Sequence, residues 1–121
     1  EMVSNPNEIW NSIREQTNDF FKSSLPLWRL SVPSVATPIS LAGKQLIEWG
    51  GAQRWLLSDM SHETIRDTVG KIGGHATRFH NDRGDGAIFH PLAPAVATLH
   101  HRLKSTFDPR GILNPGRMDN F

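Results

Sequence analysis

One stretch limits the possible folds more than any other: two strand-like runs flank Gly50-Gly51. The runs cover residues 45–49 and 53–57, and both are rich in branched and aromatic side chains. A pair of glycines between two such runs is typical of a β-hairpin. The sequence therefore predicts two antiparallel strands here.

The loop length of this hairpin decides which side chains share a face. A three-residue loop over 50–52 would gather four apolar side chains on one face, namely Ile47, Trp49, Trp55 and Leu57. A two-residue loop would set Ile47 opposite Arg54 and separate the tryptophans. We therefore predict the three-residue loop with a bulge, which leaves Glu48 and Arg54 on the opposite face.

Apolar residues at helical spacing predict three helices. The first covers about 6–22, and the second covers about 61–72 and ends at Gly73-Gly74. The third begins with Pro94 at its first position. Its apolar stripe consists of Val96, Leu99, Leu103 and Phe107.

Two further strands complete the expected set. Residues 25–33 alternate, so that one face carries Trp28, Leu30 and Val32. Residues 75–80 form another short strand, while 34–43 and 81–86 read as a loop and a turn cluster. This order predicts an α+β fold with an antiparallel or mixed sheet of about four strands and three helices mainly on one face.

The composition excludes several classes of function. The 121 residues carry a net charge of +1 and contain no cysteine, so thiolate metal sites are excluded and nucleic acid is not an expected partner. No apolar run reaches membrane-spanning length, and a cytoplasmic location is expected. Because the chain opens with Glu1-Met2 and has no leader, we expect it to begin inside a longer protein.

The histidines and arginines suggest few catalytic arrangements. His75 and His80 would lie on opposite faces of one strand, so no metal site is predicted. Arg29, Arg54 and Arg78 each stand in the middle of a predicted strand. A solvent-facing sheet surface explains them, and a cleft in which guanidinium groups grip a carboxylate is the alternative.

The last residues, 108–121, predict a stiff segment that docks on another surface. Asp108-Pro109 ends the third helix, and Gly111, Pro115 and Gly116 impose turns. The segment carries the apolar pair Ile112-Leu113. We expect residues from about 112 onward to be loosely ordered or docked on a substitute surface such as a neighbouring copy, with an exposed apolar surface that allows homo-oligomers.

This tail also carries a resemblance to a known family. Its spelling, Phe-Asp-Pro-x-Gly-x-x-Asn-Pro-Gly-Arg over residues 107–117, resembles the C-terminal signature of FAD-linked oxidases of the vanillyl-alcohol-oxidase type. Residues 27–33, 45–55 and 73–79 also resemble the E subunits of bacterial glycolate oxidases. Together these stretches cover most of residues 27–118.

The resemblance implies that residues 1–121 are a C-terminal cap domain. An N-terminal FAD-binding domain, absent from this chain, would hold FAD in the full-length subunit, and no cofactor is expected in this fragment. The family oxidises glycolate to glyoxylate as a complex with a D subunit and an iron–sulfur F subunit, which implies these partners and a peripheral association with the inner membrane. The implied contacts to the FAD domain are Ile112, Leu113, Asn114, Pro115, Gly116 and Arg117.

One departure from the wider family affects the expected site. Catalytic relatives carry a Glu-His-Gly motif where this chain reads Gly74-His75-Ala76, so no catalytic residue is assigned. The candidates for facing substrate or flavin are Arg29, His75 and Arg78. The alternatives are a non-catalytic docking module that holds the oxidase subunits together and a free-standing ligand-binding domain.

Overall fold

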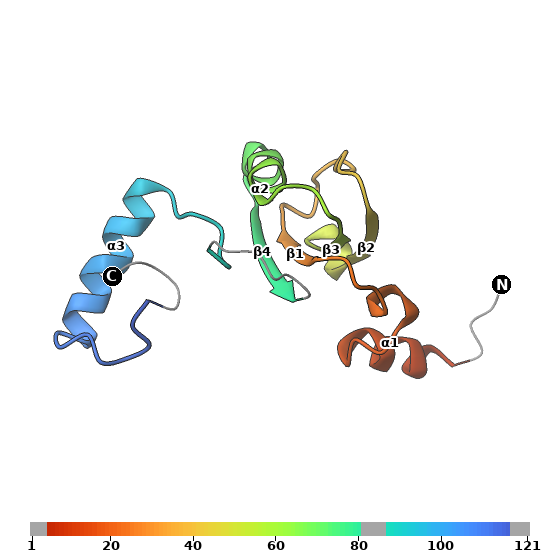
Figure 1. Ribbon diagram of the computed structural model, residues 1–121, viewed down its shortest axis with the longest axis horizontal. Coiled ribbons are helices and arrows are strands. Elements are labelled where there is room, and N and C mark those ends of the chain that lie inside the picture. Colours follow the sequence, from red (N-terminus) through yellow and green to blue (C-terminus); the bar gives the residue numbers. More distant parts are fainter. Residues whose placement is uncertain (1–4, 81–86, 117–121) are drawn as a thin grey trace. The chain divides into compact units, whose positions relative to one another are not determined.

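The computed structural model describes residues 5–80 and 87–116 (Figure 1). The chain divides into two compact units, Glu1–Asp85 and Gly86–Phe121, and each is described by itself. The described residues contain three α-helices and a four-stranded antiparallel sheet, so the predicted α+β class is confirmed. Among these residues, no helix combines the length and the apolar content needed to cross a bilayer.

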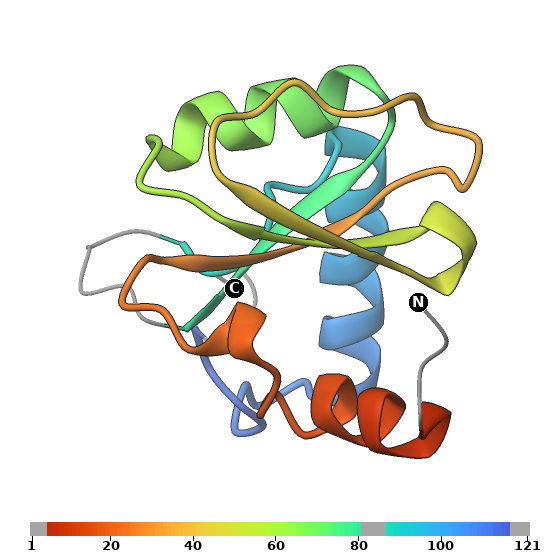
Figure 2. The same cartoon turned by 90° about the vertical axis from the view of Figure 1, so that its right-hand side faces the viewer.

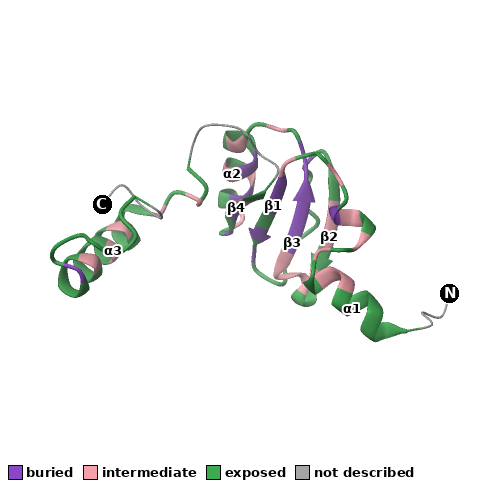
Figure 3. Ribbon diagram, turned by 60° about the horizontal axis from the view of Figure 1, so that its bottom comes forward, coloured by how far each residue is buried: buried purple, intermediate pink, exposed green. Residues whose placement is uncertain are grey.

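The sheet of the first unit has the strand order β2-β3-β1-β4 (Figure 1). Its strands are β1 (Leu27–Ser31), β2 (Lys44–Glu48), β3 (Gln53–Leu57) and β4 (His75–His80), and all neighbours pair antiparallel. Buried residues concentrate on the two central strands, β1 and β3 (Figure 3). This sheet matches the four strands that the sequence predicts.

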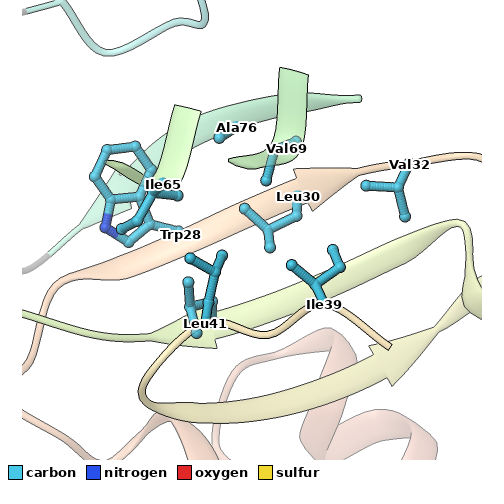
Figure 4. Packing of buried hydrophobic residues seen from close by; sticks show 9 residues of the cluster. Trp28, Leu30, Val32, Ile39, Leu41, Ile65, Val69 and Ala76 are labelled. Atoms are coloured by element: carbon cyan, nitrogen blue, oxygen red, sulfur yellow. The ribbon is translucent and has the colours of Figure 1, made fainter. Parts of the chain in front are cut away.

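Helix α2 (His62–Lys71) covers one face of the sheet, which is called the α2 face below. The Ser61 hydroxyl accepts a hydrogen bond from the backbone N–H of Thr64 and caps the helix start. Ile65 and Val69 of α2 pack on the strands in a buried cluster (Figure 4). The strands and the preceding loop contribute Trp28, Leu30, Val32, Ile39, Leu41, Leu56 and Ala76 to this cluster.

A second, smaller cluster lies on the other face, which is called the aromatic face below. It contains Phe21, Leu27, Trp55 and Leu57, with Ile13, Phe20 and Leu46 packed against it. Phe20 and Phe21 belong to the short 3-10 helix η1 (Asp19–Phe21), and Ile13 belongs to α1 (Pro6–Arg14). The helices of this unit therefore lie on both faces of the sheet and not mainly on one (Figure 2).

The first helix is shorter than the predicted span of 6–22, because α1 ends at Arg14. Gln16 adopts the left-handed backbone conformation, with φ of 56°, and turns the chain. The side-chain oxygen of Asn18 then accepts a hydrogen bond from the N–H of Phe20 at 3.0 Å and starts η1. Asparagine competes with helical hydrogen bonds in this way, so the apolar spacing continues although the helix does not.

The hairpin register differs from the prediction by one residue. Leu46 faces Trp55 and Ile47 faces Arg54, while a 3-10 turn η2 (Trp49–Gly51) joins the strands. The predicted cluster of Ile47, Trp49, Trp55 and Leu57 is therefore wrong, and Ile47 is 60% exposed. Leu46 takes the expected place beside Trp55 and Leu57.

Arg54 explains why the chain adopts this register. Its side chain is 3% exposed and donates hydrogen bonds to three backbone carbonyls of the surrounding loops. They are those of Gly51 (3.2 Å), Thr37 (2.9 Å) and Ala36 (2.6 Å). Arg54 is thus neither solvent-facing nor part of a cleft, because its charge is satisfied by the loop over 34–43.

Two other side chains hold the same loop. Gln45 donates to the carbonyls of Ile39 and Leu41, and the Ser58 hydroxyl donates to the carbonyl of Ala42 at 2.6 Å. These bonds satisfy backbone groups that would otherwise be buried without partners. The loop can therefore bring Ile39 and Leu41 into the core although it has no regular structure.

The second unit consists of α3 (Pro94–Phe107) and the segment that follows it. The helix begins at Pro94 as predicted. Its apolar stripe is exposed at Val96, Leu99, Leu103 and Phe107, so the described residues of this unit do not bury it themselves. A stripe of this kind is typical of a surface that meets another element.

Candidate functional site

The structure separates the three predicted site residues. Arg29 pairs across the sheet with Trp55 and Thr77, so its side chain lies on the aromatic face. His75 pairs with Ser31 and lies on this face as well, diagonally beside Arg29. Arg78 pairs with Trp28 and lies on the α2 face. Arg29 and His75 can therefore act on one ligand, whereas Arg78 faces the other way.

A row of aromatic rings begins beside Arg29 on its face of the sheet. The Arg29 guanidinium carbon lies 5.9 Å from the centre of the Phe79 ring, within range of a cation–π interaction. Phe79 contacts Trp55 edge to face at a centroid distance of 5.0 Å, and Trp55 contacts Phe21 in the same way at 5.5 Å. Phe79 is 43% exposed, so these rings form a partly open apolar wall beside a positive charge.

This arrangement can bind and orient a small anion but shows no group for bond cleavage. A guanidinium group offers parallel donors that match a carboxylate, and His75 adds an exposed ring nitrogen. Among residues 5–80 and 87–116, no three His, Asp or Glu side chains gather as a metal site would require. The turn cluster at 81–86 lies outside the described residues.

The described residues contain no phosphate site of the Rossmann type. In that type of site a dinucleotide binds with its phosphates at the start of a helix that follows a glycine-rich loop. Helices α1 and α3 begin at prolines, and α2 begins after Met60-Ser61, so none of them follows such a loop. No chemical step through a flavin is therefore assigned to these residues.

The start of the predicted docking tail folds back on the end of α3. The buried carboxylate of Asp108 accepts hydrogen bonds from the backbone N–H groups of Ile112 (3.0 Å) and Leu113 (2.9 Å). The ammonium group of Lys104 donates to Asp108 and to the carbonyl of Leu113. Gly111 turns the chain with φ of 63°. We call this arrangement the Asp108 anchor.

The Asp108 anchor orders the tail without burying its apolar pair. Ile112 and Leu113 are 67% and 58% exposed. Asn114 and Gly116 both have positive φ, which continues the turning path, and Arg117 lies outside the described residues. The sequence predicts that residues from about 112 onward are loosely ordered or docked on a substitute surface, and at Ile112 and Leu113 the structure shows backbone hydrogen bonds to Asp108 of the same unit.

The pKa of Asp108 predicts how the anchor responds to acid. The bond from Lys104, followed by that from the Leu113 N–H, holds the pKa of this carboxyl below its ordinary value of 3.8. Because the pKa of Asp108 is lower in the folded state, its carboxylate stabilises the anchor when the pH is above the ordinary pKa. This stabilisation is lost as the pH falls through the lowered pKa. We expect the Ile112 and Leu113 amides to stay protected from hydrogen exchange between about pH 7 and 5, and to lose protection as pH falls below 3.8 through the lowered pKa.

The variant Asp108→Asn separates this effect from other acid effects. It removes the charge while keeping the size of the side chain, so the two amides should exchange faster at pH 7 as well. Protection that persists in Asp108→Asn at neutral pH would contradict the anchor.

Comparisons with known proteins give two matches in sequence. Residues 90–118, which include α3 and the Asp108 anchor, match the family described as FAD linked oxidases, C-terminal domain. The chain is also similar to the glycolate oxidase subunit GlcE of Escherichia coli (strain K12), with 46% identity over 111 residues. This alignment covers 92% of the chain but only 31% of that subunit. No solved structure gives a significant match.

The resemblance that the sequence carries is thereby confirmed in two regions, since the family match falls on the tail and the alignment extends over nearly the whole chain. An identity of 46% over this length exceeds what a shared fold alone would produce. The chain is therefore similar to the glycolate oxidase subunit GlcE over about a third of that subunit's length, and residues 90–118 match the C-terminal domain of FAD linked oxidases.

Proposed function

We propose that this chain is the cap region of an FAD-dependent oxidoreductase subunit that takes part in oxidising glycolate to glyoxylate. The observation that carries the proposal is the 46% identity to GlcE across nearly the whole chain. The chain spans about a third of that relative, so the FAD-binding part would belong to the rest of the subunit. FAD would supply the redox chemistry there, and the residues described here would bind and orient the substrate.

The aromatic face is the better side for a substrate contact. Glycolate carries one carboxylate, and Arg29 offers a matching pair of donors beside the Phe79 ring. His75, which stands on the same face, would hydrogen-bond the substrate from its ring nitrogen. Placing Arg29 and His75 toward the flavin domain would exclude water from the reacting carbon, because Phe79 and Trp55 line the same side.

The tail and the stripe of α3 would serve assembly. Ile112 and Leu113 expose their side chains on an ordered backbone, which suits docking on the FAD-binding domain. The D subunit and the iron–sulfur F subunit of the complex are the further partners that we propose. A purely non-catalytic docking module is the alternative.

The test uses the full-length subunit within its assembled complex. We expect Arg29→Ala to raise the KM for glycolate by about tenfold or more, since a charge-assisted hydrogen bond contributes about 1.5–3 kcal/mol. His75→Ala should act in the same direction with a smaller effect. Glycolate-dependent reduction of an artificial electron acceptor gives both constants, and FAD absorbance gives the flavin content.

Arg14→Ala is the matched control, because Arg14 is an exposed arginine outside the sheet. It should leave the KM and kcat unchanged. A complex that assembles with FAD but keeps its KM in both Arg29→Ala and His75→Ala would favour the docking module. In that case Leu113→Asp should reduce the recovery of partner subunits without changing the KM.

A further inference from the structure

Trp28 on the α2 face carries a buried donor without a partner. The residue is almost fully buried, and among the described residues its indole Nε1 has no hydrogen-bond acceptor. Figure 4 shows Trp28 at one end of the core cluster, with its nitrogen on the side of the ring away from Leu30. Buried indole N–H groups usually find an acceptor, so this one points to a group that binds there.

Two arginines stand next to this indole. The guanidinium carbon of Arg66 on α2 lies 5.7 Å from the centre of the Trp28 ring. Arg78 on β4 is the cross-strand partner of Trp28, so its side chain leaves the sheet on the same face. Helix α2 and strands β1 and β4 therefore bring two positive charges and one indole donor together.

Arg66 and Arg78 lie close enough for their charges to interact. Burial, and then the nearby charge of Arg78, lower the pKa of Arg66 below its ordinary value. Both arginines make other interactions as well. A bound anion would add an acceptor for their guanidinium donors and would supply the acceptor that the indole lacks.

We propose that Trp28, Arg66 and Arg78 form a binding site for a small oxyanion, either a carboxylate or a phosphate. Its oxygens would accept hydrogen bonds from the two guanidinium groups and from the indole N–H. This site lies on the α2 face, whereas Arg29 and His75 lie on the aromatic face. It is therefore separate from the glycolate contact proposed above and does not depend on it.

The test follows the indole N–H signal of Trp28 by NMR in the 121-residue chain. Trp28→Phe assigns the signal by removing it. Sodium phosphate and sodium oxalate are titrated separately, with sodium chloride keeping the ionic strength constant. We expect a saturable shift of the Trp28 signal with at least one of the two anions, and none with chloride alone. The exposed Trp49 is the internal control and should not shift.

We expect the affinity for the anion to fall by about tenfold or more in Arg78→Gln and in Arg66→Met. Unchanged Trp55 signals would report that the sheet is intact in each variant. A shift with phosphate alone identifies a phosphate site, and a shift with oxalate alone identifies a carboxylate site. No saturable shift with either anion would overturn the proposal. Equal affinity in the wild type and Arg78→Gln would also overturn it, and this second readout holds even when Arg66→Met fails to fold.

Discussion

Gly43→Ala should destabilise the first unit by about 3–5 kcal/mol, because two separate costs act at this position. Gly43 has φ of 131°, which disfavours any residue with a Cβ. A Cβ built here would also press on the Leu57 carbonyl oxygen and lie 3.1 Å from Cβ of Ser58. These are atoms of strand β3 and its exit, so they cannot move without breaking the pairing of Lys44 with Leu57.

Urea unfolding followed by tryptophan fluorescence measures this loss. Gly50→Ala is the matched control, since Gly50 also has positive φ but nothing lies within 4 Å of a built Cβ. It should cost about 1–2 kcal/mol, for the backbone conformation alone. Similar losses in the two variants would show that the close approach of Gly43 to β3 has no energetic consequence.

Arg54→Met should cost about 3 kcal/mol or more, because a buried acceptor that loses its donor costs about 1–3 kcal/mol and three carbonyls lose theirs. Methionine keeps most of the side-chain length but leaves the carbonyls of Ala36, Thr37 and Gly51 without their donor. The loop over 34–43 should loosen first, so its amides should exchange faster than those of α2.

Arg29→Met provides the comparison for Arg54→Met. Arg29 is also a strand arginine, but it is exposed and its described contact is a ring. This variant should change the free energy of unfolding by less than about 0.5 kcal/mol, as exposed substitutions usually do. If Arg54→Met were equally mild, the loop would be held by Gln45, Ser58 and apolar packing alone.

The regular elements with strong local signals were predictable from sequence. The second helix was predicted over 61–72 and extends over His62–Lys71, because Ser61 caps its start and the glycines end it. The strand at 75–80 has the predicted bounds. The helix depends on interactions between residues close in sequence, and the strand, although it pairs with the distant β1, is bounded by local signals such as Gly73-Gly74.

The hairpin register was not predictable in this way. The apolar pattern disfavours a register in which Arg54 lies opposite Ile47, because arginine is polar. It therefore favours the wrong loop length. The three acceptors of Arg54 include carbonyls that lie 17 and 18 positions away along the chain, and no local pattern contains them. The hairpin register is thus set by a long-range polar contact, whereas the local apolar pattern predicts the wrong register.

The candidate site was likewise predictable only in part. The resemblance selected Arg29, His75 and Arg78; strand alternation alone separates Arg78 from His75, and the pairing register of β1 with β4 places Arg29 on the His75 side. Arg66 and Trp28 were not selected, because α2 and β1 are far apart in sequence and nothing local joins them. The available signal was the position of Arg66 next to the buried Ile65, at the border of the helix face that meets the sheet.

The Asp108 anchor has a consequence for the rate at which the tail associates. A flexible peptide must lose backbone freedom when it binds, and this loss subtracts from its affinity. In this chain the carboxylate of Asp108 already fixes the backbone at Ile112 and Leu113. If the tail docks in this conformation, as proposed above, encounters with a complementary surface begin from the bound conformation, and a larger fraction of them should be productive. Releasing the anchor would slow association while leaving the apolar contacts, and so the dissociation rate, nearly unchanged.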